Sequence, residues 1–155
     1  MRGLMKFVPL VVLAGVVGCD LATAPEVRSS GSQYPLSAEW RVSVTGLNGA
    51  PITGQGVFRD YRAYYEGEFS ISNGAPNTNY NWRIYRGTCE NSSTTIAGNS
   101  TTQYTPLATG GNGSASVQRT FSGHLTLLGH QQYNLRVLSG TAISTTVACG
   151  NLQRQ

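Results

Sequence analysis

From residue 37 onward the chain consists largely of short stretches in which apolar and polar residues alternate. In the stretch 39–47, Trp40, Val42 and Val44 are separated by single polar residues. Successive side chains of a β-strand point to opposite faces, so this alternation predicts a strand with one buried and one exposed face. Similar stretches span 52–61, 65–72, 80–86, 114–121, 132–138 and 143–149. Many short strands with turn residues between them indicate an antiparallel sandwich or barrel.

Two segments depart from this pattern. Gly54 and Gly56 interrupt the stretch 52–61, so we expect a weaker strand or a bulged edge strand there. The segment 89–102 is rich in serine, threonine and asparagine and lacks a core-forming pattern, so we expect a long surface loop. Residues 37–152 are enough for one domain with a core but not for two.

The first 18 residues have the layout of a secretory signal. Arg2 and Lys6 precede an uncharged apolar run from residue 7 to residue 17. A transmembrane helix needs about 20 apolar residues, and this run is shorter. We therefore interpret residues 1–18 as a signal peptide that is cleaved on export.

The signal ends in Val16-Val17-Gly18-Cys19, which resembles the lipobox of bacterial lipoproteins. The resemblance implies that Cys19 is lipidated and anchors the protein to a membrane, since two or more acyl chains hold a domain durably on a bilayer. Residues 19–36 are then a lipidated flexible tether. The expected location is the cell envelope, on its periplasmic or surface-facing side. An ordinary signal peptide with a cysteine near its cleavage site is the alternative.

Two further cysteines, Cys89 and Cys149, remain when Cys19 is assigned to the lipid. In an oxidising compartment we expect them to form a disulfide. Closing a loop of about 60 residues stabilises a fold by roughly 4 kcal/mol in the chain-entropy estimate. Two free buried thiols are the alternative.

The segments 82–89 (WRIYRGTC) and 147–152 (VACGNL) together resemble the copper/zinc superoxide dismutases and related metal-free sandwiches, including the CHRD group. In the dismutases a His-x-His pair on a strand is followed by Gly-x-Cys, and that cysteine is bonded to the cysteine of a C-terminal Ala-Cys-Gly. The resemblance implies an all-β, antiparallel, Greek-key-like sandwich, and it implies the Cys89–Cys149 pairing.

The metal ligands of that family are missing from this sequence. Aligned on the cysteine, the His-x-His positions fall on Arg83 and Tyr85, or on Trp82 and Ile84 if the register shifts by one. Neither alignment supplies an imidazole, and a permanently charged arginine does not bind a metal cation.

Other parts of the dismutase site are also absent. The chain contains two histidines, His124 and His130, both in a glycine-rich connection, and Thr146 stands where the family has an arginine. We therefore expect no metal, no cofactor and no enzymatic activity.

Charge and acidic content exclude further classes of function. Removing Arg2 and Lys6 with the signal lowers the formal charge from +4 to +2. The remaining arginines are scattered, so we do not expect nucleic-acid binding. The chain has only seven acidic residues and no Gly-x-Ser-x-Gly elbow, which argues against a hydrolase.

The segment 59–65 (RDYRAYY) is the first binding candidate, through Arg59, Tyr61 and Arg62. Tyrosine and arginine are enriched at recognition surfaces and can stack on a sugar ring or clamp an anion. A strand end with half-buried tyrosines is the alternative. Arg83 and Tyr85 are a second candidate, as a polar face inherited from an ancestral metal site, or simply as the solvent side of a strand.

These observations predict a non-catalytic lipoprotein that presents a disulfide-closed sandwich as a binding or structural module. Its expected partners are the membrane, through Cys19, and an envelope protein or glycan. One alternative is a metal-handling or redox protein of the dismutase lineage, and another is a surface assembly or adhesion protein.

Overall fold

The computed structural model describes residues 34–97, 104–122, 127–140 and 145–155, which belong to one compact unit, Ser32–Gln155. The strands are β1 (Ala38–Gly46), β2 (Thr53–Asp60), β3 (Tyr64–Ser72), β4 (Asn79–Gly87), β5 (Ser92–Ile96), β6 (Leu107–Ala108), β7 (Ala115–Ser122), β8 (Tyr133–Ser139), β9 (Thr145–Asn151) and β10 (Gln153–Arg154). Within the described part of the chain, no helix is long and apolar enough to cross a membrane.

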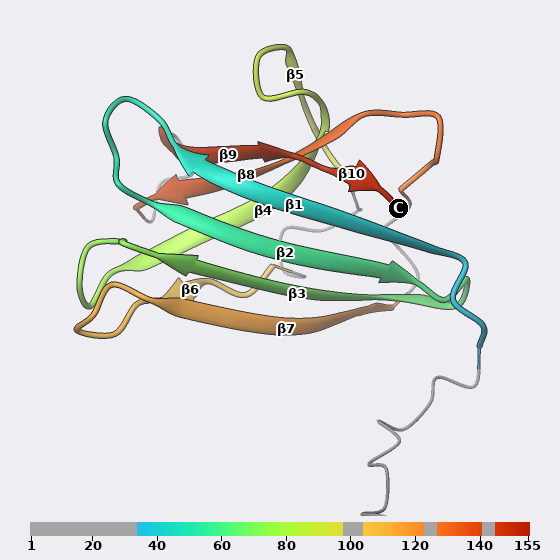
Figure 1. The fold of residues 1–155 in the computed structure, drawn as a ribbon, viewed down its shortest axis with the longest axis horizontal. Helices are drawn as coiled ribbons and strands as arrows, with labels where there is room; N and C mark the ends of the chain where they lie inside the picture. Colours follow the sequence, from blue (N-terminus) through green and yellow to red (C-terminus); the bar gives the residue numbers. More distant parts are fainter. Residues whose placement is uncertain (1–33, 98–103, 123–126, 141–144) are drawn as a thin grey trace, which may run out of the picture. The chain divides into compact units, whose positions relative to one another are not determined.

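The strands form one antiparallel sheet in the order β5-β4-β8-β9-β1-β2-β3-β7, with β10 paired to β1 and β6 paired to β4. Strands β1 to β3 are a meander in which each strand pairs with the next. The chain then crosses to β4 in the other half of the sheet, returns to pair β7 with β3, and crosses again to pair β8 with β4. Figure 1 shows β2, β3 and β7 on one side of β1 and β8 and β9 on the other.

The structure confirms an all-β antiparallel domain and corrects the predicted sandwich of two sheets. Strand β1 is hydrogen-bonded to β2 along one edge and to β9 and β10 along the other, so both halves belong to one curled sheet, a half-barrel. Alternation in sequence shows that each strand has one buried face, and this holds for a sandwich and for a curled sheet alike. The pattern therefore could not distinguish them.

The core lies inside the curl, and Trp82 of β4 is at its centre. Its ring centroid lies 5.4 Å from that of Phe69 on β3 and 4.9 Å from that of Tyr104. The indole Nε1 donates a hydrogen bond of 2.8 Å to the carbonyl oxygen of Thr105. Because β3 and β4 lie in different halves of the sheet, these contacts hold the two halves together across the curl.

Strand β2 is a central strand, not the weak or edge strand that its glycines suggested. It pairs along its whole length with β1 and β3. A Cβ atom on Gly54 would lie 2.4 Å from the carbonyl oxygen of Ser70, and one on Gly56 would lie 3.0 Å from Cγ1 of Val42. These glycines therefore mark close approach of neighbouring groups inside a tightly curled sheet.

Three short strands were not predicted. Strand β5 lies inside the segment 89–102, which the composition indicated to be a loop. Strand β6 has two residues, and β10 also has two and lies beyond residue 152, the expected end of the domain. Such short strands depend on pairing with β4 or β1 rather than on a pattern of their own.

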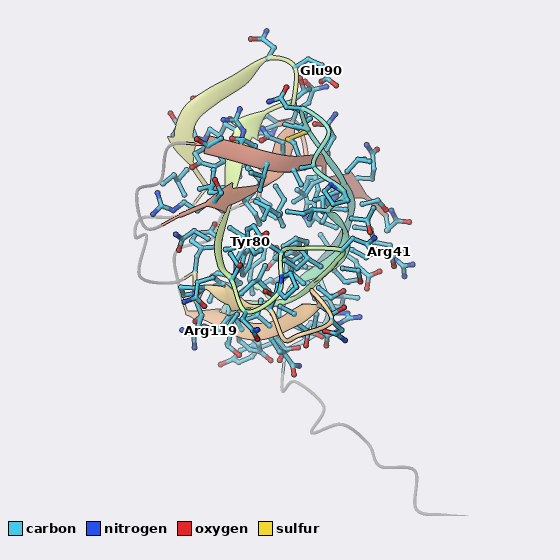
Figure 2. The ribbon with its side chains drawn as sticks, turned by 90° about the vertical axis from the view of Figure 1, so that its left-hand side faces the viewer. Arg41, Tyr80, Glu90 and Arg119 are labelled. Carbon is cyan, nitrogen blue, oxygen red and sulfur yellow. A yellow bond between two sulfur atoms is a disulfide. The ribbon has the colours of Figure 1, made fainter. Side chains whose placement is uncertain are left out.

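The structure confirms the disulfide between Cys89 and Cys149, whose Cα atoms are 6.0 Å apart. It joins the loop after β4 to β9, close to Glu90 at one end of the domain (Figure 2). A disulfide of this kind indicates an oxidising, extracytoplasmic location.

Replacing both cysteines, as Cys89→Ala with Cys149→Ala, should lower the free energy of unfolding by about 4 kcal/mol, because the unfolded chain regains the freedom of a long loop. Urea unfolding of the exported protein measures this. Reduction of the wild-type protein should reproduce the loss, whereas an unchanged midpoint in both samples would show that the bond is not a major source of stability.

Candidate functional site

A belt of charged and polar side chains crosses the outer face of β1, β2, β3 and β7. On β1, Glu39 accepts hydrogen bonds from Nε of Arg41 at 2.8 Å and from Nε of Arg59 at 3.1 Å. Arg59 also lies 3.8 Å from the carboxylate of Glu68, which accepts a hydrogen bond of 3.3 Å from Gln118. The predicted binding residue Arg59 therefore holds this belt together, and its guanidinium is shared between two carboxylates.

The belt changes the acidity of Glu39. The hydrogen bond from Arg41 is the main cause that holds the pKa of Glu39 below its ordinary value of 4.5. Partial burial opposes this lowering, and Arg59 adds to it. The ionised form of Glu39 is thus the one that the fold stabilises.

Tyrosine rings gather at the turn between β2 and β3, where the predicted residues Tyr61 and Arg62 lie. Tyr61 stacks on Tyr64 with ring centroids 5.2 Å apart, and Tyr34 meets Tyr64 edge-on at 6.4 Å. Arg62 is exposed and has a positive φ of 66°, and its backbone N–H donates to Asp60. Burial, followed by the charge of nearby Glu66, raises the pKa of Tyr61.

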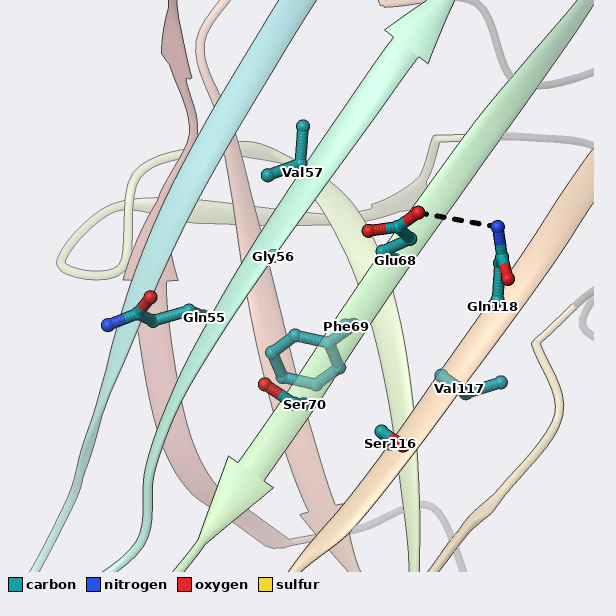
Figure 3. A pocket seen from close by; sticks show the side chains of 9 residues that line it. All are labelled: Gln55, Gly56, Val57, Glu68, Phe69, Ser70, Ser116, Val117 and Gln118. Carbon is teal, nitrogen blue, oxygen red and sulfur yellow. Dashed lines mark hydrogen bonds between the residues drawn. The ribbon is translucent and has the colours of Figure 1, made fainter. Parts of the chain in front are cut away.

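A shallow groove of about 520 Å³ lies over β2, β3 and β7. Its polar lining consists of Gln55, Glu68, Ser70, Ser116 and Gln118, and Figure 3 shows these side chains around the groove.

A smaller hollow between β3 and β7 adjoins this groove, because Gln118 lines both. Glu66 and Thr120 also line the hollow. Tyr64 is two positions before Glu66 and so lies on the same face of β3. The groove and the stacked tyrosines are therefore parts of one outer surface.

The second predicted pair, Arg83 and Tyr85, does not face open solvent. Both side chains project from the outer face of β4, but they are only 9% and 7% exposed. The guanidinium carbon of Arg136 on β8 lies 5.0 Å from the centroid of the Tyr85 ring. Arg83 and Tyr85 are therefore largely covered, and neither residue lines the groove.

Two asparagines that sequence reasoning missed hold the loop of Cys89 against this site. Asn134 of β8 is fully buried, and its Nδ2 donates to the carbonyl oxygens of Gly87 and Thr88 at 3.0 and 3.3 Å. The backbone N–H of Cys89 donates to Oδ1 of Asn151 at 2.8 Å. An asparagine among the mostly apolar residues of this strand was the available signal for Asn134.

The remaining sequence candidates give no site in the described part of the chain. Cys19 and His124 lie outside the described residues, and His130 is an exposed turn residue. No three histidine, cysteine, aspartate or glutamate side chains among the described residues are grouped closely enough to hold a metal ion. Arg83 and Tyr85, which the sequence resemblance aligned with copper ligands, do not fit a copper site.

Comparison with known proteins gives no family for this chain. No family model matches the sequence, and no curated protein matches it significantly.

Replacing Glu39 by glutamine should lower stability by less than about 1 kcal/mol at pH 7, because the ion pairs are partly exposed. The folded pKa of Glu39 is lowered, so its contribution is present above the unfolded pKa and is lost as pH falls through the folded pKa. Urea unfolding should show that the difference from wild type shrinks on acidification below pH 4.5. A difference that grows there would contradict this assignment, and Glu66→Gln is the control.

Proposed function

We propose that this protein is a non-catalytic lipoprotein of the bacterial cell envelope, anchored through Cys19, whose domain binds an envelope glycan on the outer face of β2, β3 and β7. The signal peptide, the lipobox-like end of that signal and the Cys89–Cys149 disulfide support export. The tether of residues 19–36 gives the domain reach from the membrane.

The observation that carries the glycan proposal is the polar groove with tyrosines at one end. Amide, hydroxyl and carboxylate groups of the lining are donors and acceptors for sugar hydroxyls. The stacked rings of Tyr61 and Tyr64 offer an aromatic platform, and exposed Arg62 beside them offers a cation. Such a combination of aromatic and adaptable polar groups is typical of recognition surfaces.

We further propose that the domain descends from a dismutase-like Greek-key sandwich that has lost its metal. Two features support this descent: the crossings between the halves of the sheet from β3 to β4 and from β7 to β8, and a disulfide from the loop after β4 to the last long strand. Arg83 and Tyr85, at the positions of the family's copper ligands, both project from the outer face of β4.

A lipid anchor at Cys19 predicts the mass of the mature protein and its attachment to membranes. Mass spectrometry of the native protein without reductant should give a chain that begins at Cys19, carries acyl groups and contains an intact disulfide. Cys19→Ala should release the protein from membranes, since the lipid provides the attachment. A membrane-bound Cys19→Ala protein, or an unmodified Cys19 in the wild type, would contradict the anchor.

Replacing Tyr61 and Tyr64 together by alanine should weaken glycan binding by about tenfold or more, because aromatic anchors of an interface contribute about 2 kcal/mol. Calorimetric titration of the exported protein with solubilised peptidoglycan fragments, and with lipopolysaccharide-derived oligosaccharides, measures this. The Tyr61→Phe, Tyr64→Phe protein keeps both rings and should bind like wild type. Absence of binding to both probes, or equal binding by the alanine variant, would overturn the proposal.

A further inference from the structure

Acidic residues are distributed unevenly along the domain. Glu39, Asp60, Glu66 and Glu68 lie on or beside β1, β2 and β3, and after Glu68 the chain contains a single further acidic residue, Glu90. Five arginines follow in that part of the chain, at positions 83, 86, 119, 136 and 154. Three of them, Arg83, Arg86 and Arg136, lie on β4 and β8, whereas the other two lie on β7 and β10. Strands β4 and β8 contain no acidic residue, so this half of the sheet has a surplus of positive charge.

Two of these arginines face each other at close quarters. Arg83 of β4 is directly opposite Arg136 of β8 in the register of the sheet, so both side chains emerge side by side on the same face. Arg83 is only 9% exposed, and no hydrogen bond or ion pair connects it to a described residue. Like charges directly opposite each other destabilise a sheet, and an anion bound between them offsets the repulsion.

The surroundings fix the guanidinium group of Arg136 without neutralising it. Nε of Arg136 donates a hydrogen bond of 3.1 Å to Oδ1 of Asn134, and its guanidinium lies over the ring of Tyr85. Cys149 of β9 is directly opposite Arg136 in the register of the sheet. The disulfide and its loop therefore border the site.

Glu90, the acidic residue next to Cys89, does not form a salt bridge with either arginine. Hydrogen bonds from its own backbone N–H and from Thr88 lower the pKa of Glu90, so these groups hold its carboxylate in the loop. The salt bridges of the described residues join only Arg41 and Arg59 to carboxylates.

From this geometry we propose that Arg83 and Arg136 form a binding site for a small oxyanion, the phosphate or carboxylate group of a ligand, on the outer face of β4 and β8. Guanidinium groups bind both kinds of oxyanion through paired N–H donors. The recessed position of Arg83 suits a single small anionic group rather than a broad surface. This site is distinct from the glycan groove and does not depend on it.

The test is calorimetric titration of the exported, detergent-purified protein at low ionic strength with inorganic phosphate and, separately, with succinate. Sodium chloride at matched ionic strength is the reference. At least one oxyanion should bind while chloride does not, and the stronger of the two identifies the group that the natural ligand carries. Failure of both oxyanions to bind above the chloride reference would overturn the proposal.

Arg136→Gln should reduce the affinity for the better oxyanion by about tenfold or more, since a charge-assisted hydrogen bond is lost. Arg83→Gln should do the same, and Arg83→Lys should bind more weakly than wild type despite its retained charge. Arg86→Gln is the matched control, because Arg86 is exposed on the same strand and the net charge changes equally. If Arg83→Gln does not fold, half-exposed Arg136 carries the test, and equal affinity of Arg136→Gln and wild type would contradict the site.

Discussion

The covalent bond between Cys89 and Cys149 is the constraint on which the outer face of β4, β8 and β9 depends. The loop between β4 and the edge strand β5 contains Cys89, and the bond holds this loop to β9. Buried Asn134 donates hydrogen bonds to the carbonyl oxygens of Gly87 and Thr88, and Asn151 accepts a hydrogen bond from the backbone N–H of Cys89. The covalent link and these hydrogen bonds act together, because buried polar groups remain stable only when each has a partner.

The curled sheet presents two chemically different outer surfaces. Over β1, β2 and β3 the arginines are paired with carboxylates, which leaves a nearly neutral, hydrogen-bonding surface suited to uncharged polar ligands. Over β4 and β8 the arginines lack carboxylate partners among the described residues, which favours an anion. The domain thus has one surface suited to a glycan and a separate surface suited to an acidic group.

The positions of the longer strands and the disulfide could be predicted from sequence because they depend on local alternation and on a small number of cysteines. The curl could not, since it depends on pairing β1 with β9 and on close packing at Gly54 and Gly56. The burial of Arg83 was missed for a similar reason. Alternation places Arg83 on the outer face, but only tertiary structure shows that this face is covered there and that Arg136 lies opposite.

The central claim is that a ligand occupies the outer surface of β3 and β7. Hydrogen–deuterium exchange of the exported protein, with and without saturating peptidoglycan fragments, tests it most directly. We expect slower exchange in peptides that cover β3 and β7 and in the turn at Tyr61, with β8 and β9 unchanged. Protection confined to other strands, at saturating glycan, would contradict it.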